Sequence, residues 1–89
     1  MKFYIYILHS ERTKKYYIGQ TNNLIHRLHY HNTGRNLSTK AGRPWKIIYS
    51  ENFAFRSEAV QRERFLKSPK GWLDLRSIKE HHRNVAQPG

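Results

Sequence analysis

The 89-residue chain contains no cysteine, which excludes a disulfide framework and any metal site built from thiolates. It also lacks an apolar run near the ~20 residues that a transmembrane helix needs. Residues 1–8 are apolar and interrupted by tyrosines, and no small-residue cleavage site follows, so they predict a strand and not a signal peptide. We expect a cytoplasmic location, with which the missing cysteines are compatible.

Acidic residues are scarce: six Asp and Glu stand against 17 Lys and Arg, which leaves a formal net charge of +11 at pH 7. The basic residues are spread from Lys2 to Arg83 and not gathered in a tail, so we expect a basic face on a folded domain. This charge favours nucleic acid as the partner. An anionic membrane surface fits less well, because no basic amphipathic helix with a clean apolar face is present.

Periodicity and turn residues predict one domain over residues 1–83, followed by a frayed tail at 84–89. The predicted elements are strands at 3–9, 15–19 and 45–51, and helices ending near Thr33, at Lys67 and near His82. The expected helix caps are Thr21 or Asn22, Ser57, and Ser68. In this β-β-α-β-α-α order the first two strands must be antiparallel, because their connection is short.

The first strand is apolar on both faces. Its alternating side chains divide into Phe3, Ile5 and Ile7 on one face and Tyr4, Tyr6 and Leu8 on the other. Such a strand suits the centre of a sheet that helices cover on both sides. On the second strand, Tyr17 and Gly19 share a face. The glycine is either a simple turn or a place where the backbone must approach a ligand or a helix closely.

The first helix carries an apolar stripe of Leu24, Ile25 and Leu28, and Arg27 and His31 lie beside it, four residues apart. Both polar side chains should therefore stand at the edge of the buried face, where they can lean over the sheet. Each alone is equally consistent with an arginine lying over apolar surface or a half-exposed histidine.

On the second helix, Glu63 falls on the inner face marked by Ala59, Val60 and Leu66. A carboxylate there is costly unless it is paired or binds a metal. A solvated i,i+4 pair with Lys67 is the alternative, and it better fits a glutamate on the outside. One carboxylate can anchor a single Mg²⁺ that keeps its waters and borrows a phosphate oxygen.

A metal, an arginine clamp and a proton acceptor would together make a site for phosphodiester hydrolysis. A tyrosine could be the acceptor, because a nearby Arg27 and a bound cation would favour phenolate. We expect Tyr4 and Tyr16 to be structural, as most strand tyrosines are. The pairs His29-x-His31 and His81-His82 have no matching acidic partners, which argues against a zinc site.

These residues, in this order and spacing, resemble the GIY-YIG nuclease family. The first motif is present as Tyr4-Ile5-Tyr6, a variant that replaces the first glycine, and the second as Tyr17-Ile18-Gly19. The likeness continues through residues 20–28, 31–32, 43–49, 58–59 and 62–67. It covers about residues 3–67, as a small stand-alone domain of this family would.

The resemblance implies an α+β fold, a three-stranded antiparallel sheet flanked by helices. It also implies an endonuclease that hydrolyses DNA phosphodiester bonds with one Mg²⁺ or Mn²⁺ ion. By position, Tyr6 and Tyr17 would orient or deprotonate the water, Arg27 would bind the scissile phosphate, His31 would assist, and Glu63 would hold the metal. The expected DNA contacts are Arg35, Lys40 and Arg43 in the polar loop 34–44, and Lys67.

Many members of the family carry a late asparagine, for which Asn84 is the one candidate, and separate targeting domains, for which this sequence leaves no room. We therefore expect a structure-selective or weakly specific endonuclease of DNA repair or recombination, with no small-molecule cofactor. The alternatives are a basic nucleic-acid-binding module that does not cut, which the charge supports equally well, and an RNA- or ribosome-associated protein.

Overall fold

The structure, a computed structural model, describes residues 1–85, and the side chains of residues 1–82. Its elements are β1 (Phe3–Ser10), β2 (Tyr16–Thr21), α1 (Leu24–Asn32), β3 (Trp45–Phe53), α2 (Arg56–Lys67) and α3 (Trp72–Val85). The α+β class and the order β-β-α-β-α-α are confirmed. Of the expected frayed tail, residues 86–89 lie outside the described residues. No helix within residues 1–85 is long and apolar enough to cross a membrane.

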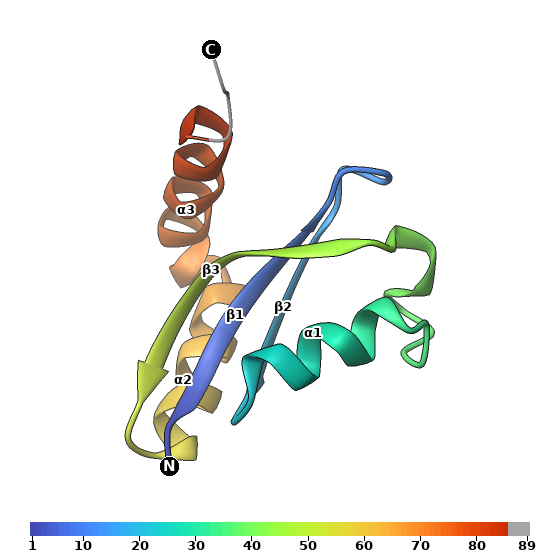
Figure 1. Cartoon of the computed structure of the whole chain (residues 1–89). Coiled ribbons are helices and arrows are strands. Elements are labelled where there is room, and N and C mark those ends of the chain that lie inside the picture. Colours follow the sequence, from blue (N-terminus) through green and yellow to red (C-terminus); the bar gives the residue numbers. More distant parts are fainter. Residues whose placement is uncertain (86–89) are drawn as a thin grey trace.

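The three strands form one antiparallel sheet in the order β2-β1-β3, so β1 is central as predicted (Figure 1). Tyr6 in the middle of β1 lies opposite Gly19 of β2 and Ser50 of β3. A bulge shifts the β1–β3 register between Ile7 and Leu8. This pairing puts the tyrosine motif of β1 directly against the glycine of the second motif.

Helices cover both faces of the sheet (Figure 1). On one face, Ile5 and Ile7 pack with Ala59 and Leu66 of α2, and Leu75 and Ile78 of α3 lie against this cluster. On the other face, Tyr6 and Leu8 pack with Trp45, and Leu24 and Leu28 of α1 close that side. The two-sided apolar pattern of β1 thus has its physical explanation, and Tyr6 belongs to the α1 side.

Several local predictions were wrong at the helix ends. Asn23 is the N-cap of α1, because its side-chain oxygen accepts from the His26 amide at 3.0 Å. Ile25 is 83% exposed, so only Leu24 and Leu28 of the expected apolar stripe pack against the sheet. The second helix begins at Arg56, so Ser57 lies inside its first turn. Pro69–Gly71 forms a separate 3₁₀ turn before α3, which runs to Val85 and not to His82.

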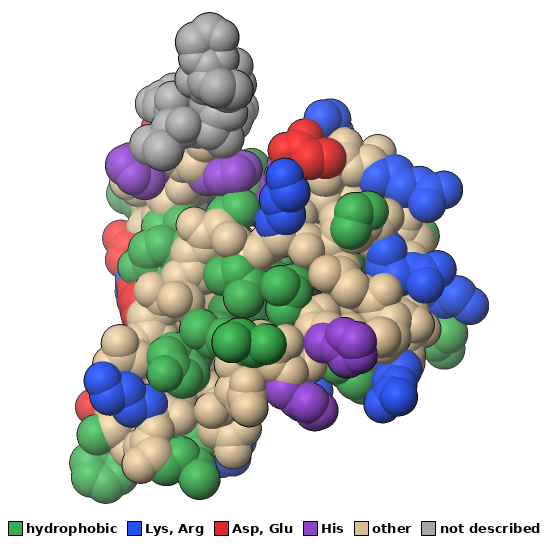
Figure 2. Space-filling model, viewed as in Figure 1, with side chains coloured by type: hydrophobic (Ala, Val, Ile, Leu, Met, Phe, Trp, Pro, Cys, Tyr) green, Lys and Arg blue, Asp and Glu red, His purple; other side chains and the backbone are tan. Residues whose placement is uncertain are grey.

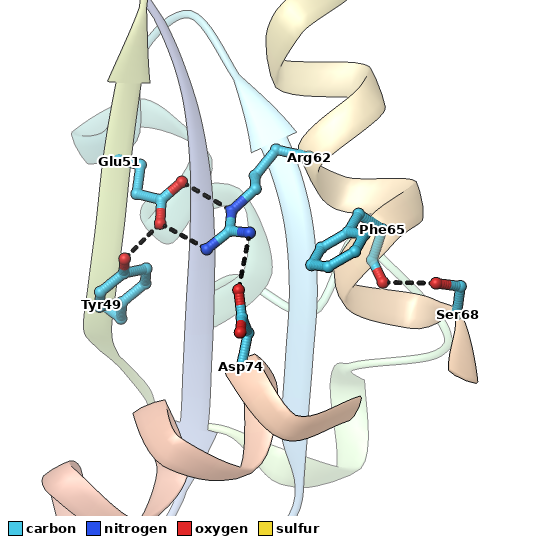
Figure 3. A network of polar contacts seen from close by, with 6 residues as sticks. All are labelled: Tyr49, Glu51, Arg62, Phe65, Ser68 and Asp74. Carbon is cyan, nitrogen blue, oxygen red and sulfur yellow. Dashed lines mark hydrogen bonds and ion pairs between the residues drawn. The ribbon is translucent and has the colours of Figure 1, made fainter. Parts of the chain in front are cut away.

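Arg62 of α2 holds the helices to β3 (Figure 3). Its guanidinium makes two hydrogen bonds to Glu51 of β3, at 2.9 and 3.0 Å, and a third to Asp74 of α3 at 3.2 Å. The Tyr49 hydroxyl donates to the same Glu51 carboxylate. Burial would raise the pKa of Glu51, but the bonds from Arg62 and Tyr49 outweigh it and lower that pKa. This network fixes the rotation of α2, and with it the direction in which Glu63 points.

Replacing Arg62 by methionine should lower the free energy of unfolding by about 2 kcal/mol at pH 7, because it leaves the largely covered Glu51 carboxylate without its bidentate partner. Because the pKa of Glu51 is lower in the folded protein, the stability that its charge contributes is fully present above the pKa of the unfolded chain, about 4.5. This stability is lost as the pH falls through the pKa of the folded protein. The difference between wild type and variant should therefore shrink in acid. Urea unfolding at pH 7 and pH 3 measures both.

The matched control is Arg76→Met. Arg76 also pairs with a carboxylate, Glu80, but both side chains are at least half exposed. Such a pair contributes within about 0.5 kcal/mol. If the two variants lose equal stability, Arg62 is an ordinary surface arginine and does not orient α2.

Candidate active site

The Tyr6 hydroxyl joins two elements of the fold, β1 and α1. Tyr6 is 1% exposed, and its hydroxyl lies 3.0 Å from Nε2 of His31. The same oxygen accepts from Nε of Arg27 at 3.4 Å. Arg27 and His31 lie one turn apart on α1, and that turn faces the sheet, as their spacing predicted. Strand β1 and helix α1 therefore bring a phenol, an imidazole and a guanidinium together.

His31 is more enclosed than the sequence indicated. Instead of standing half-exposed at the edge, it is 0% exposed, because the segment between α1 and β3 folds over it. Thr39 in that segment places its hydroxyl 2.9 Å from Nδ1 of His31. Thr39 was missed, since it appeared as one more polar residue in a loop. Its burial comes from Trp45, whose indole N–H donates to the Thr39 carbonyl at 2.7 Å.

One assignment of protons satisfies every group in this chain of contacts. The Thr39 hydroxyl donates to the Asn36 carbonyl, so its oxygen accepts from Nδ1–H of His31. Nε2 of His31 is then the bare nitrogen and accepts the Tyr6 proton. The Tyr6 oxygen accepts in turn from Arg27. The opposite tautomer would leave the phenol proton without an acceptor, because a guanidinium only donates.

The environment keeps the phenol and the imidazole neutral. Burial raises the pKa of Tyr6 above 10.0; the hydrogen bond from Arg27 opposes this, while Tyr17 and Glu63 add to the rise. Burial lowers the pKa of His31 below 6.5, and the charge of Arg27 lowers it further. The bond to Tyr6 raises the pKa of Arg27. Near pH 7 the cluster therefore holds a neutral phenol, a neutral imidazole able to accept a proton, and one cation.

Tyr17 completes an aromatic wall around His31. Its ring centroid lies 4.8 Å from that of His31 and 6.4 Å from that of Tyr6. Tyr30 lies edge-on to His31, at 5.6 Å, and the Arg27 guanidinium stands 4.8 Å from the centre of the Tyr30 ring. These rings leave Arg27 and Tyr17 partly exposed while His31 is enclosed. Arg27 and Tyr17 are thus the polar residues of this group that solvent or a substrate can reach most readily.

Gly19 is required by Tyr6. A Cβ at residue 19 would lie 2.5 Å from the Tyr6 hydroxyl oxygen and 2.6 Å from the ring carbon that carries it. Real Cβ atoms do not approach other atoms so closely. Of the two interpretations of this glycine, close approach is correct, but the group that comes close is a side chain of the site itself.

Gly19→Ala should therefore cost about 1–3 kcal/mol of stability, because the Tyr6 ring must move within a packed core. The displaced hydroxyl should also lose its bond to His31. Urea unfolding measures the first effect, and the ¹⁵N and ¹H shifts of the His31 ring report the second. The control is Ser50→Ala, which lies opposite Tyr6 on the other neighbouring strand and is exposed. A Gly19→Ala protein as stable as Ser50→Ala would show that the ring has room to spare.

Glu63 lies on α2, the helix that packs on the opposite face of the sheet from α1 (Figure 1). Its side chain is 22% exposed, and one carboxylate oxygen pairs with Nζ of Lys67 at 2.7 Å. Its charge contributes to the raised pKa of Tyr6, so the carboxylate acts on that hydroxyl through space. The glutamate is thus both largely covered and paired at i,i+4, two arrangements that the sequence had presented as alternatives. Within the described residues, its second oxygen has no protein hydrogen bond.

The expected DNA-contacting residues occupy different settings. Arg35 and Lys40 are exposed in the segment between α1 and β3, whereas Arg43 is partly buried and donates to the Lys40 carbonyl. Lys67 is exposed but pairs with Glu63. Figure 2 shows basic side chains gathered over the β1–β2 hairpin and the segment between α1 and β3. The exposed members there include Arg12, Lys14, Lys15, Arg35, Lys40 and Lys46.

Two further residues have structural roles. Tyr16 packs against the Ile5–Ile7 cluster, where the sequence placed it. Asn32, which the sequence indicated only as part of the family motif, anchors the end of α1: its side-chain amide accepts from the Trp45 backbone N–H at 2.6 Å and donates to the Trp45 carbonyl at 3.1 Å. This pair of hydrogen bonds sets the distance between α1 and β3. The side chain of Asn84 is outside the described side chains.

The chain belongs to the GIY-YIG nuclease family. The family model of the GIY-YIG catalytic domain matches residues 2–72, which contain both tyrosine motifs, Arg27, His31 and Glu63. This confirms the resemblance drawn from the motifs, and the match extends it to the 3₁₀ turn before α3.

Relatives place the chain among small proteins of this family. It is 43% identical over 65 residues to a UPF0213 protein of Oceanobacillus iheyensis, covering 72% of this chain and 74% of that protein. It is 41% identical over 70 residues to one of Streptococcus pneumoniae, covering 78% and 70%. It also resembles the solution NMR structure of a UPF0213 protein from Bacillus halodurans, with a TM-score of 0.52, 28% identity and coverage of 89% and 86%. These relatives' names state no activity.

Proposed function

We propose that the protein is a metal-dependent endonuclease that hydrolyses DNA phosphodiester bonds. The observation that supports this most is that Arg27 and His31 both contact the Tyr6 hydroxyl. The Glu63 carboxylate is close enough for its charge to add to the raised pKa of that hydroxyl. A structural polar network in a core needs no exposed cation and no nearby carboxylate. This one combines a partly exposed guanidinium with a buried proton acceptor, as phosphate chemistry requires.

Arg27 binds the scissile phosphate in this proposal. Its Nε is committed to Tyr6, which fixes the guanidinium plane and leaves the terminal nitrogens for phosphate oxygens. Contact with the Tyr30 ring holds the guanidinium from the other side. The phosphate would then lie within reach of the Tyr6 and Tyr17 hydroxyls, which orient the attacking water.

The proton of that water passes to the Tyr6 oxygen as the phenol proton moves to Nε2 of His31. The relay needs no resting phenolate, which the burial of Tyr6 disfavours. It uses the bare nitrogen that the Thr39 contact leaves on His31. The imidazolium formed is stabilised by the negative phosphate that Arg27 has brought in. Tyr6 thus accepts the proton of the water while it passes its own proton to His31, and Tyr17 positions the water.

The residues present fit one divalent ion of the Mg²⁺ or Mn²⁺ type. Glu63 offers the carboxylate oxygen that Lys67 does not hold, and a single carboxylate suffices for an ion that keeps several waters. Such an ion would stabilise negative charge on the phosphate and on the leaving oxygen. Lys67, relieved of part of its pairing with Glu63, would be available to a neighbouring phosphate.

The basic hairpin and the segment between α1 and β3 would bind the flanking DNA (Figure 2). The exposed cations there form a surface without an element shaped to enter a groove, so we propose that DNA shape, more than base sequence, selects the site. Branched or distorted DNA of the kind formed in repair or recombination is the substrate class that this surface favours.

The direct test incubates the purified protein with supercoiled plasmid, linear duplex and a branched junction, each in Mg²⁺ and in EDTA. We expect Mg²⁺-dependent nicking, with the junction cut faster than the linear duplex. Absence of cleavage in both Mg²⁺ and Mn²⁺, with DNA binding intact, would remove the proposal. Equal cutting of junction and duplex would remove only the preference for structure.

The net charge of +11 favours a second candidate, a basic module that binds nucleic acid without cutting it. Its affinity would fall steeply with salt, because binding releases counterions from the phosphates, and would not depend on metal. Under this alternative, Tyr6 and Glu63 substitutions change nothing except a small part of the affinity.

A further inference from the structure

A group of metal-ligating side chains lies away from the candidate active site. His9 at the end of β1, Glu11 in the β1–β2 hairpin and His82 of α3 each offer a ligand atom, and these three atoms lie within 4.8 Å of one another. His9 is on the sheet face that α2 and α3 cover, whereas Tyr6 and Tyr17 are on the α1 face. The prediction that His81-His82 has no matching acidic partner is wrong, because the fold brings Glu11, 71 positions earlier in the chain, close to His82.

We propose that His9, Glu11 and His82 bind one divalent transition-metal ion of the Zn²⁺ type, with water completing the coordination. Two imidazoles and one carboxylate are the ligands that zinc commonly takes in proteins. Mg²⁺ prefers oxygen ligands only, so this group would not select the ion proposed for Glu63. Ligand bonds near ~2.1 Å require the three atoms to draw closer together, which the exposed Glu11 side chain can do by changing rotamer.

The two carboxylate oxygens of Glu11 face different side chains. One oxygen accepts from Nζ of Lys14 at 3.1 Å, while the other faces Nδ1 of His9 at 3.6 Å. The second distance is beyond a hydrogen bond, so that oxygen and that nitrogen are close without satisfying each other. The hairpin backbone holds Lys14 in place with φ of 60°, and its amide donates to the Ser10 carbonyl at 2.8 Å. Lys14 thus orients the carboxylate in the way that outer partners orient metal ligands.

The two imidazoles approach each other from different elements. The His9 and His82 ring centroids lie 5.0 Å apart, and the Tyr16 ring centroid lies 4.7 Å from that of His9. One turn before His82, Lys79 stands over the Tyr16 ring at 4.5 Å. An ion here would fasten the C-terminal half of α3 to the β1–β2 hairpin.

The test is a Zn²⁺ titration by isothermal calorimetry without DNA, so its outcome is independent of nuclease activity. We expect one Zn²⁺ per chain, and at least a ~10-fold loss of affinity in both Glu11→Gln and His82→Ala, since changing even an outer partner of a metal site costs that much. The matched control is His81→Ala, an exposed neighbour on the same helix that is outside the cluster. It should bind within about twofold of wild type.

Zn²⁺ should also raise the melting temperature of wild type and of His81→Ala, but not of His82→Ala, because an ion that binds only the folded chain stabilises it. Excess Mg²⁺ should leave the Zn²⁺ isotherm unchanged. The proposal is overturned if wild type shows no saturable Zn²⁺ binding, if His82→Ala and His81→Ala bind equally, or if Mg²⁺ displaces Zn²⁺ at equimolar concentration.

Discussion

Tyr6→Phe should lose about 1,000-fold in the rate of Mg²⁺-dependent plasmid nicking, within the range that a positioned proton acceptor contributes. The change removes the one oxygen that forms hydrogen bonds with both Arg27 and His31. The phenyl ring still fills its place beside Leu8 and Trp45, so the fold should persist. A loss of about 1–2 kcal/mol in stability is expected, because the buried His31 nitrogen loses its donor. Initial nicking rates and urea unfolding measure the two effects separately.

Tyr4→Phe is the matched control for this experiment. Tyr4 lies on the same strand and the same face, two residues earlier, and its hydroxyl has no hydrogen bond among the described residues. It should nick at close to the wild-type rate. A Tyr6→Phe protein as active as Tyr4→Phe would remove the relay through His31 and shift the role of base to Tyr17.

Much of this site follows from short-range patterns in the sequence. Period-two alternation places Tyr6 on one face of β1 and Ile5 on the other, and the register then sets Gly19 opposite Tyr6. Helical spacing puts Arg27 and His31 one turn apart. These features depend on residues that are close in the chain or paired across a short hairpin, so local geometry is enough to predict them.

The parts that the sequence did not reveal all depend on contacts between distant segments. Thr39 reaches His31 only because Trp45 and Asn32 draw the intervening segment over α1. Arg62 sets the rotation of α2 through Glu51, a residue of β3 that no helical pattern connects to it. These partners are ordinary polar residues in the sequence, and their role appears only when packing has removed the alternative of hydrogen bonding to water.

The proposed metal requirement predicts that Glu63→Gln loses at least about 1,000-fold in nicking, since a bound ion supplies several kcal/mol of transition-state stabilisation. Glutamine keeps the size of the side chain but removes the charge that would hold the ion. DNA affinity should not fall, because a negative charge is lost and Lys67 is released from its pair. Nicking rates over a range of Mg²⁺ concentrations, with gel-shift affinities measured in EDTA, separate catalysis from binding.

Glu80→Gln provides the control, because Glu80 also forms an i,i+4 ion pair on a helix, with Arg76 at 3.0 Å, but on α3 and away from Tyr6. If breaking such a pair were the cause of inactivity, both variants would be impaired. We expect Glu80→Gln to retain activity. Wild-type nicking by Glu63→Gln would instead mean that the cleavage comes from a contaminant or that the ion is held elsewhere. The Tyr6→Phe result distinguishes these two cases, because a contaminating nuclease would be indifferent to the phenol as well.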